Sequence, residues 1–217
     1  MEDRINHWIV GVTGASGICY AKKLILALIN SGVKIDLILS QAALLVAKEE
    51  HNEVKTASLQ GVAKWLTEDK VNKGLVKLFS NNNISASCAS GSALRSGMVI
   101  CPCSVNTLSS IACGVSSNLI QRAADVTLKE RRKLILVPRE TPLSAIHLKN
   151  MLSLSQLGAV ILPACPGFYS KPTVLEDIVD FVVMKILDQM GISNSLSFRW
   201  EKEEAKTSSL KALKPIK

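Results

Sequence analysis

The 217-residue sequence is poor in aromatic residues and has no long apolar run. Aromatic side chains make up 4% of the chain, too few to form a series of stacking platforms for single-stranded nucleic acid. No apolar run reaches the roughly 20 residues that span a bilayer. The first seven residues carry both charge signs, unlike a basic and apolar leader. We therefore expect no nucleic-acid partner, no membrane association and a cytoplasmic location.

The sequence also lacks the spacings that are typical of metal sites and disulfides. Its six cysteines include no C-x-x-C pair and fall mostly in apolar stretches, where a thiol packs as a small hydrophobic group. The three histidines have no metal-ligand spacing between them. We expect neither disulfides nor a bound metal. The net charge of +8 comes from scattered basic residues, so the expected partners are small anionic molecules.

Apolar runs that alternate with helical stretches predict one α/β domain over residues 1–200. The expected strands are 8–12, 34–39, 98–101, 134–137 and 159–162, and the expected helices are 18–30, 59–66, 118–129, 144–157 and 174–190. This order predicts a doubly wound, Rossmann-like and mostly parallel sheet with helices on both faces. Residues 80–97 are rich in Ser, Asn and Gly and predict a loop. The charged tail, 201–217, is expected to be disordered or peripheral.

The first expected strand leads into a glycine turn, GVTGASG, whose spacing differs from the dinucleotide fingerprint G-x-G-x-x-G. Val12 takes the place of the first glycine, and the second strand ends at Ser40 instead of an acidic residue that would bind a ribose diol. Gly14 and Gly17 would let backbone N–H groups approach an anion at the start of the following helix. Considered alone, the turn is equally consistent with a simple strand-to-helix connection.

A second turn, in MVICPCSVNTLSSIACG, strengthens the case for an anion site. Ser104 is placed to cap a helix whose first turn contains Asn106 and Thr107. Two helix N-termini with hydroxyl groups, at the ends of neighbouring strands, predict a mononucleotide cleft. Arg139 and Glu140 follow another strand and precede a proline turn, which would fix them at the mouth of this cleft.

The basic residues of the nearby segment RAADVTLKERR have a plainer interpretation. Arg122, Lys129, Arg131 and Arg132 could form the solvated face of a helix, which is the usual role of such a charge run.

Taken in order, the motifs GVTGASG, MVICPCS, RAADVTLKERR, LVPRETP and GAVILPACPGFY resemble the UbiX-like flavin prenyltransferases over residues 9–200. This family belongs to a flavoprotein superfamily that includes flavin-containing cysteine decarboxylases. The resemblance implies metal-independent transfer of a dimethylallyl group from dimethylallyl monophosphate to N5 and C6 of reduced FMN. The prenylated FMN would serve a partner decarboxylase of ubiquinone biosynthesis or of aromatic acids. The same resemblance implies a homododecamer with sites at subunit junctions.

The resemblance also implies roles for individual residues. The implied FMN ligands are Gly14, Ala15, Ser16, Ser40, Ser104, Val105, Asn106, Thr107 and Arg139. The implied donor site consists of Ser90, Gly91, Lys129, Arg139, Tyr169 and Lys185, with Ser90 and Gly91 reaching in from a neighbouring subunit. The implied catalytic residues are Ser16, Glu50, Lys129 and Glu140. The cationic groups would stabilise the leaving phosphate, and Glu140 would handle a proton at N5.

The sequence departs from close relatives at two places. Lys185 stands where an arginine is common, and Ile84 lies in a segment that often carries a tryptophan. Lysine keeps the charge but loses the bidentate fork. The aromatic face that could stabilise an allylic cation is absent from that segment.

Three other functions were compared with this one. A flavin-dependent cysteine decarboxylase would need a histidine and a Met-Asn motif that find no counterpart here. A non-catalytic FMN-binding subunit or carrier would not need Glu50, Lys129, Glu140 and Tyr169 together. The acids in LEDIVDFV resemble a magnesium motif of diphosphate prenyltransferases, but acids in the first turn of a helix ordinarily complement its dipole.

Overall fold

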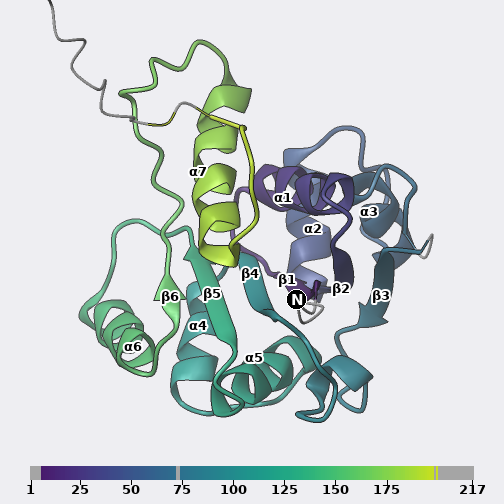
Figure 1. The fold of residues 1–217 in the computed structure, drawn as a ribbon, viewed down its shortest axis with the longest axis vertical. Helices are drawn as coiled ribbons and strands as arrows, with labels where there is room; N and C mark the ends of the chain where they lie inside the picture. The colour runs from purple at the N-terminus through teal and green to yellow at the C-terminus, as the bar shows by residue number, and fades with distance from the viewer. Residues whose placement is uncertain (1–5, 72–73, 198, 200–217) are drawn as a thin grey trace, which may run out of the picture.

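A sheet of six parallel strands forms the centre of the molecule (Figure 1). The computed structural model describes residues 6–71, 74–197 and 199. The strands are β1 (His7–Val12), β2 (Lys34–Leu39), β3 (Val76–Ser80), β4 (Gly97–Cys103), β5 (Lys133–Pro138) and β6 (Val160–Ile161). Their order across the sheet is β3-β2-β1-β4-β5-β6. This is the doubly wound order, in which the chain adds β2 and β3 on one side of β1 and then returns to add β4, β5 and β6 on the other side. Sheets of this kind bind ligands at the carboxyl ends of the two strands where the order reverses, here β1 and β4.

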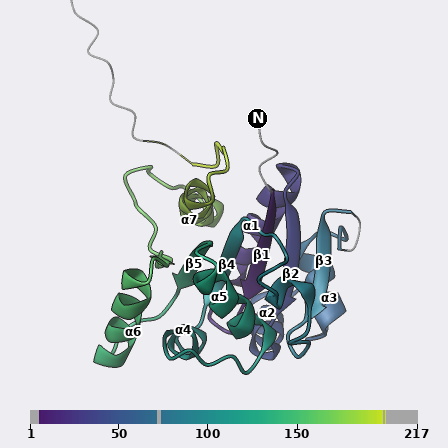
Figure 2. The same ribbon diagram turned by 60° about the horizontal axis from the view of Figure 1, so that its bottom comes forward.

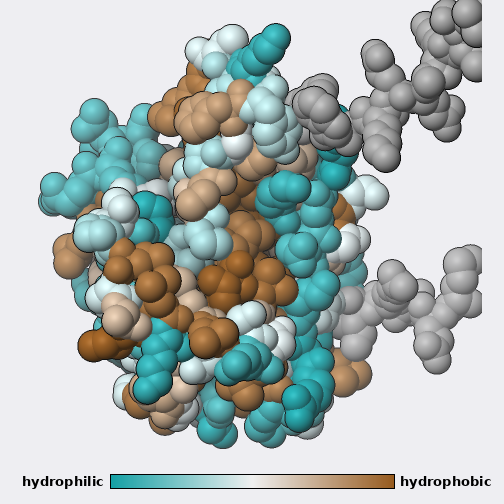
Figure 3. Space-filling model, turned by 90° about the vertical axis from the view of Figure 1, so that its left-hand side faces the viewer, coloured by the Kyte–Doolittle hydropathy of each residue, from teal (hydrophilic) through white to brown (hydrophobic). Residues whose placement is uncertain are grey.

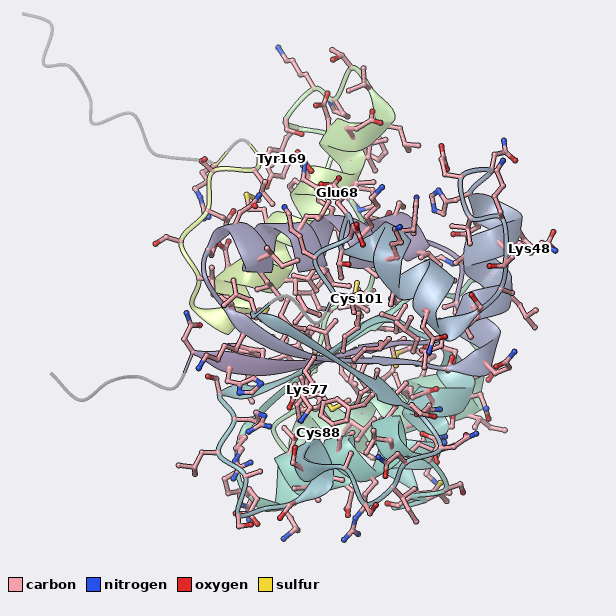
Figure 4. The ribbon with its side chains drawn as sticks, turned by 90° about the vertical axis from the view of Figure 1, so that its right-hand side faces the viewer. Lys48, Glu68, Lys77, Cys88, Cys101 and Tyr169 are labelled. Atoms are coloured by element: carbon pink, nitrogen blue, oxygen red, sulfur yellow. The ribbon has the colours of Figure 1, made fainter. Side chains whose placement is uncertain are left out.

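Helices cover both faces of the sheet. The helices are α1 (Ile18–Asn30), α2 (Gln41–Glu50), α3 (Leu59–Leu66), α4 (Val105–Ala112), α5 (Leu119–Lys129), α6 (Ala145–Gln156) and α7 (Leu175–Met190), and a 3₁₀ turn spans Ser87–Ala89. One layer contains α1, α2, α3 and α7, and the other contains α4, α5 and α6 (Figure 4). In Figure 2, α6 and α3 lie at opposite edges of the molecule. The predicted fold class is confirmed.

Successive side chains along each strand point to opposite faces of the sheet, so the apolar core consists of two halves, one on each face. In β1, Trp8 and Val10 pack into the layer with α1 and α7, whereas Ile9 packs into the other layer. All three are less than 5% exposed, as expected for strands that are covered on both faces. Figure 4 shows the same division for Cys101 and Cys88, which lie on opposite sides of the sheet. Burial raises the pKa of the Cys88 thiol to about 11.

The structure differs from the sequence-based expectation in several elements. Helix α2 and strand β3 were not predicted, β4 and β5 are longer than expected at both ends, and β6 is shorter. Strand β3 lies at the edge of the sheet, and its five residues do not alternate regularly between buried and exposed positions. The sheet is entirely parallel. The tail, 201–217, lies outside the described residues.

Candidate functional site

The turns that follow β1 and β4 are joined by one buried side chain. The Thr13 hydroxyl donates to the carbonyl oxygen of Pro102 at 2.9 Å and accepts from the backbone N–H of Ser104 at 2.7 Å. The Thr13 N–H also donates to Pro102 at 3.2 Å. Because Thr13 is only 1% exposed, its role is to hold the two turns together. No local sequence pattern indicates this contact, which joins residues 91 positions apart.

The N-terminus of α1 holds a carboxylate of the chain itself. Both carboxylate oxygens of Glu50 accept from the N–H of Gly17 at 3.0 Å, and one also accepts from Ile18 at 3.0 Å. The sequence predicted an anion at this place, and Glu50 supplies its negative charge to the positive end of the helix dipole. Glu50 ends α2, and the next residue, His51, packs on the ring of Trp65 with centroids 4.4 Å apart.

Helix α2 begins directly beside the first glycine turn. A Cβ atom at Gly14 would collide with the Cβ of Ala42, so the glycine is required for packing as well as for any approach of a ligand. The Ser40 hydroxyl caps α2 by accepting from Ala43 N–H at 3.1 Å. The N-termini of α1 and α2 therefore lie side by side at the carboxyl edge of the sheet, next to the half-buried Ser40.

The N-terminus of α4 completes this edge. The Ser104 hydroxyl accepts from Thr107 N–H at 3.3 Å and donates to the Thr107 hydroxyl at 3.0 Å. Ser104 is therefore the helix cap that the sequence predicted, and Asn106 beside it is exposed. Val105 is the first residue of α4. Three helix N-termini therefore lie at the carboxyl ends of the neighbouring strands β2, β1 and β4, the edge at which a doubly wound sheet ordinarily binds its ligand.

Arg139 reaches from the end of β5 to the first turn. Its Nε donates to the carbonyl oxygen of Ser16 at 3.2 Å, which leaves the other N–H groups of the fork near the turn. Glu140 is exposed, and its Oε1 accepts from Thr141 N–H at 3.1 Å. The structure thus brings Gly14, Ala15, Ser16, Ser40, Glu50, Ser104, Val105, Asn106, Thr107, Arg139 and Glu140 to the same edge.

Tyr20 is a further residue at this edge that the sequence analysis did not single out. Its ring lies against Gly17, where a Cβ atom would stand 2.8 Å from a ring carbon. Burial raises the pKa of Tyr20, and the nearby guanidinium of Arg139 partly opposes this shift. The available signal was its position in the first turn of α1, three residues after Gly17.

Ser90, Gly91 and Lys129 lie at the opposite end of the sheet. Lys129 is the last residue of α5, which returns the chain to the amino end of β5. The path from Lys133 to Arg139 along β5 spans about 20 Å at roughly 3.3 Å per residue. A Cβ atom at Gly91 would lie 3.2 Å from the Lys129 ammonium, so these residues are neighbours. Within one chain, Lys129 therefore does not meet Arg139 and Glu140.

Tyr169 and Lys185 occupy a third place, along α7. Tyr169 lies in the connection between β6 and α7, edge-on to Phe181 with ring centroids 5.5 Å apart (Figure 4). Lys185 is exposed and lines a hollow of about 350 Å³ between α7 and β6. The wall of this hollow includes Val160, Leu162, Cys165 and Gln189.

Two of the acids of LEDIVDFV, Asp177 and Asp180, have structural partners. Asp177 accepts from the N–H groups of Thr173 at 2.7 Å and Val174 at 3.2 Å, which hold its pKa below its usual range. Asp180 pairs with Lys23 at 2.7 Å. These contacts agree with a capping role at α7. Among the residues that the structure describes, no group of three or more His, Cys, Asp and Glu is placed to hold a metal ion.

The carboxyl-edge crevice suits a phosphorylated ligand with several hydroxyl groups. Its donors are helix N–H groups and the Arg139 fork, which bind phosphate oxygens, and serine and threonine hydroxyls, which donate and accept.

Within residues 6–71, 74–197 and 199, no helix is long and apolar enough to cross a membrane.

Comparisons with known proteins agree with this ligand chemistry. Residues 1–187 match the family model described as Flavoprotein. The flavin prenyltransferase UbiX of Pseudomonas aeruginosa is 49% identical over 192 residues, which cover 88% of this chain and 92% of that protein. A UbiX crystal structure with FMN and dimethylallyl pyrophosphate superimposes with a TM-score of 0.80 at 37% identity, covering 91% of this chain and 98% of the other. A dodecameric, FMN-dependent UbiX-like decarboxylase from Escherichia coli O157:H7 gives 0.80 at 39% identity, with coverages of 90% and 99%.

Proposed function

Because this chain belongs to the flavin prenyltransferases of the flavoprotein family, we propose that it uses dimethylallyl monophosphate and delivers prenylated FMN to a partner decarboxylase. FMN is its cofactor and the acceptor of the prenyl group. The observation that supports the proposal is the hydrogen bond from Arg139 Nε to the carbonyl oxygen of Ser16, which holds a guanidinium beside the turn that we assign to the FMN phosphate. We place the enzyme in the cytoplasm.

We place FMN in the crevice at the carboxyl edge. The hydroxyls of Ser40 and Ser104 and the polar groups of Ser16, Asn106 and Thr107 bind its phosphate and ribityl chain, supported by the close backbone at Gly14 and Ala15 and by Val105. Reduced FMN, when bound, supplies the N5 and C6 positions that accept the dimethylallyl group. The Thr13 contacts keep the turns at a fixed separation, so that the crevice is formed in advance of binding.

The side chains at the mouth manage charge and protons. The allylic C–O bond of the donor breaks, and its electron pair leaves with inorganic phosphate, whose growing charge Arg139 stabilises. The new bonds at N5 and C6 each displace one proton, and the double bond of the dimethylallyl group takes one proton up. Glu140 would carry the N5 proton to that double bond, and the leaving phosphate would accept the proton from C6. Glu50 stays hydrogen-bonded to the first N–H groups of α1 and fixes the backbone next to Ser16.

Cationic side chains replace a metal ion in this scheme. The acids that resemble a magnesium motif are already used, since Asp177 caps α7 and Asp180 pairs with Lys23. A monophosphate carries less charge than a diphosphate, and Lys129, Arg139, Lys185 and the Tyr169 hydroxyl can balance it.

A second copy of the chain supplies the rest of the donor site. Ser90, Gly91 and Lys129 lie at the amino end of the sheet, about 20 Å from Arg139 by the strand geometry. Apolar side chains gather on the side of the molecule that carries α6 (Figure 3), where Ile146 is 69% and Leu152 59% exposed. Such a patch is typical of a subunit interface. A dodecamer with sites at its junctions would join the two ends.

The proposal is tested by incubating the protein with reduced FMN and either dimethylallyl monophosphate or diphosphate, and reading the flavin by mass. We expect a flavin with one added dimethylallyl unit, formed faster from the monophosphate and unaffected by EDTA. A titration should show binding of FMN but not of NAD. Flavin binding without any change in the mass of the flavin would indicate a non-catalytic FMN carrier. Loss of product with EDTA, restored by Mg²⁺, would indicate that the acids of α7 bind a catalytic metal ion.

A further inference from the structure

Arg132 holds the backbone of the segment that carries Ser90 and Gly91. Its Nη1 donates to the carbonyl oxygen of Ala93 at 2.9 Å, and its Nη2 donates to that of Gly91 at 2.5 Å. The side chain is half-buried. Arg132 is therefore not part of a solvated helix face, in contrast to Arg122, which is exposed and pairs with Asp125 at 3.7 Å.

A second arginine anchors the same segment near its far end. Arg95 donates through Nε to a carboxylate oxygen of Asp36 at 2.7 Å, and His7 lies 3.0 Å from the other oxygen. Asp36 is 1% exposed in the middle of β2, so this pair is shielded from solvent. The segment from Ser90 to Arg95 is thus fixed to the sheet at one end and to the end of α5 at the other.

At the end that Arg132 holds, the segment Ser90–Arg95 lies against the Lys129 ammonium. Lys129 donates to the Glu130 carboxylate at 2.8 Å, and a Cβ atom at Gly91 would meet both of these charged groups. The pKa of Glu130 is held below its usual value by this lysine. The missing side chain at Gly91 leaves room for the ammonium to lie beside the loop.

We propose that Arg132 is a positioning residue for the donor half of the active site. Its fork fixes the carbonyls of Gly91 and Ala93, so that the Ser90–Gly91 loop and the Lys129 ammonium reach the neighbouring subunit as one preformed unit. Two carbonyls that are two residues apart need a planar fork with two donors, which a lysine cannot provide. This inference rests on the proposed function, since it assigns the loop and Lys129 to the binding of the donor phosphate.

The test compares Arg132→Gln and Arg132→Lys with the control Arg122→Gln, which removes an exposed guanidinium from α5, the helix that precedes Arg132. Three measurements are made on the assembled protein: flavin titration for the FMN Kd, steady-state kinetics for kcat and KM with dimethylallyl monophosphate, and amide hydrogen exchange in residues 87–96. For Arg132→Gln we expect about a tenfold or greater loss in kcat/KM, mainly through KM, since small misplacement of binding groups is costly. Exchange at residues 90–93 should quicken, and FMN affinity should stay unchanged.

Arg132→Lys keeps the charge but replaces the planar fork by a single ammonium, so it tests the fork itself. We expect it to recover only part of kcat/KM and of the exchange protection, whereas Arg122→Gln should match the parent in all three measurements. Unchanged exchange in both Arg132 variants, or kcat/KM equal to that of the parent, would overturn the positioning role. Absence of prenyl transfer by the parent itself would instead overturn the proposed function.

Discussion

At the residue scale, the hydrogen bonds separate the acids that hold the structure from the acid that can react. Both carboxylate oxygens of Glu50 are occupied by backbone N–H groups at the N-terminus of α1. Glu140 is exposed, and one of its oxygens accepts from Thr141 N–H. We therefore assign the moving proton to Glu140 and a structural role to Glu50.

Glu140→Gln should keep FMN binding and lose most of the prenyl transfer. The amide preserves the size and the hydrogen bonding of the side chain but cannot accept a proton, an ability that typically contributes about 10² to 10⁴ in rate. Ser104→Ala should have the opposite effect, weakening FMN binding and destabilising α4 by about 1 kcal/mol through loss of its cap. Flavin titration and single-turnover kinetics on both variants separate the effects. Parental turnover by Glu140→Gln would remove its catalytic role.

Lys185 should tune the use of the donor. Its side chain lines the hollow between α7 and β6, and a lysine gives charge but not two parallel hydrogen bonds. Lys185→Arg should match or exceed the parent in kcat/KM for the monophosphate, and Lys185→Ala should lose about tenfold, the size of one charged hydrogen bond. The exposed Lys55, changed to alanine, is the control. Equal kcat/KM for Lys185→Ala and the parent would place this lysine on the solvent surface.

At the element scale, the end of α5 places the basic residues of the donor half. Arg131 N–H donates to Leu128 and Arg132 N–H to Thr127, both at 3.0 Å, the two bonds of a Schellman motif. Arg131 occupies the left-handed position with φ of 56°, where glycine is the usual residue. This turn directs Arg132 back toward Gly91 while Lys129 stays at the helix end.

Arg131→Gly should stabilise the protein by about 0.5 to 1 kcal/mol, because glycine avoids the penalty of a Cβ in the left-handed conformation. Arg122→Gly, in the exposed middle of α5, should destabilise it by about 1 kcal/mol. Urea unfolding at one fixed protein concentration measures both. A loss of stability in Arg131→Gly as large as that in Arg122→Gly would show that the turn carries no such strain.

The sequence allowed the carboxyl-edge half of the site to be predicted and left the other half unplaced. Both turns have local signals, namely glycine spacing and the cap at Ser104, and these elements formed as expected. The roles of Thr13 and Arg132 depend on contacts between distant segments, which no local pattern reports. Strand β3 was missed because only Val76 and Phe79 of its five residues are buried.

At the scale of the whole molecule, the predicted site residues divide between opposite ends of one sheet. The FMN groups lie at its carboxyl edge, and Lys129 with its loop lies at the amino edge. The account therefore requires contact between copies, and the exposed apolar face of α6 is the surface that we assign to it (Figure 3).

Leu152→Glu should reduce assembly and prenyl transfer together while FMN still binds, since a charge on this patch opposes burial against another subunit. Gln156→Glu adds the same charge at the end of the same helix and should leave the assembly intact. Light scattering and flavin titration give the two readings. A fully assembled Leu152→Glu protein would exclude this part of α6 from the interface.

The most direct test of the shared site is complementation between Lys129→Ala and Glu140→Gln. Each variant alone should be nearly inactive, because every junction lacks one essential group. Co-expressed in equal amounts, they should recover about a quarter of the parental transfer, since about a quarter of randomly mixed junctions contain both intact residues. Co-assembled variants that are no more active than either one alone would contradict a site shared between subunits and would indicate that Lys129 and Glu140 act within the same chain.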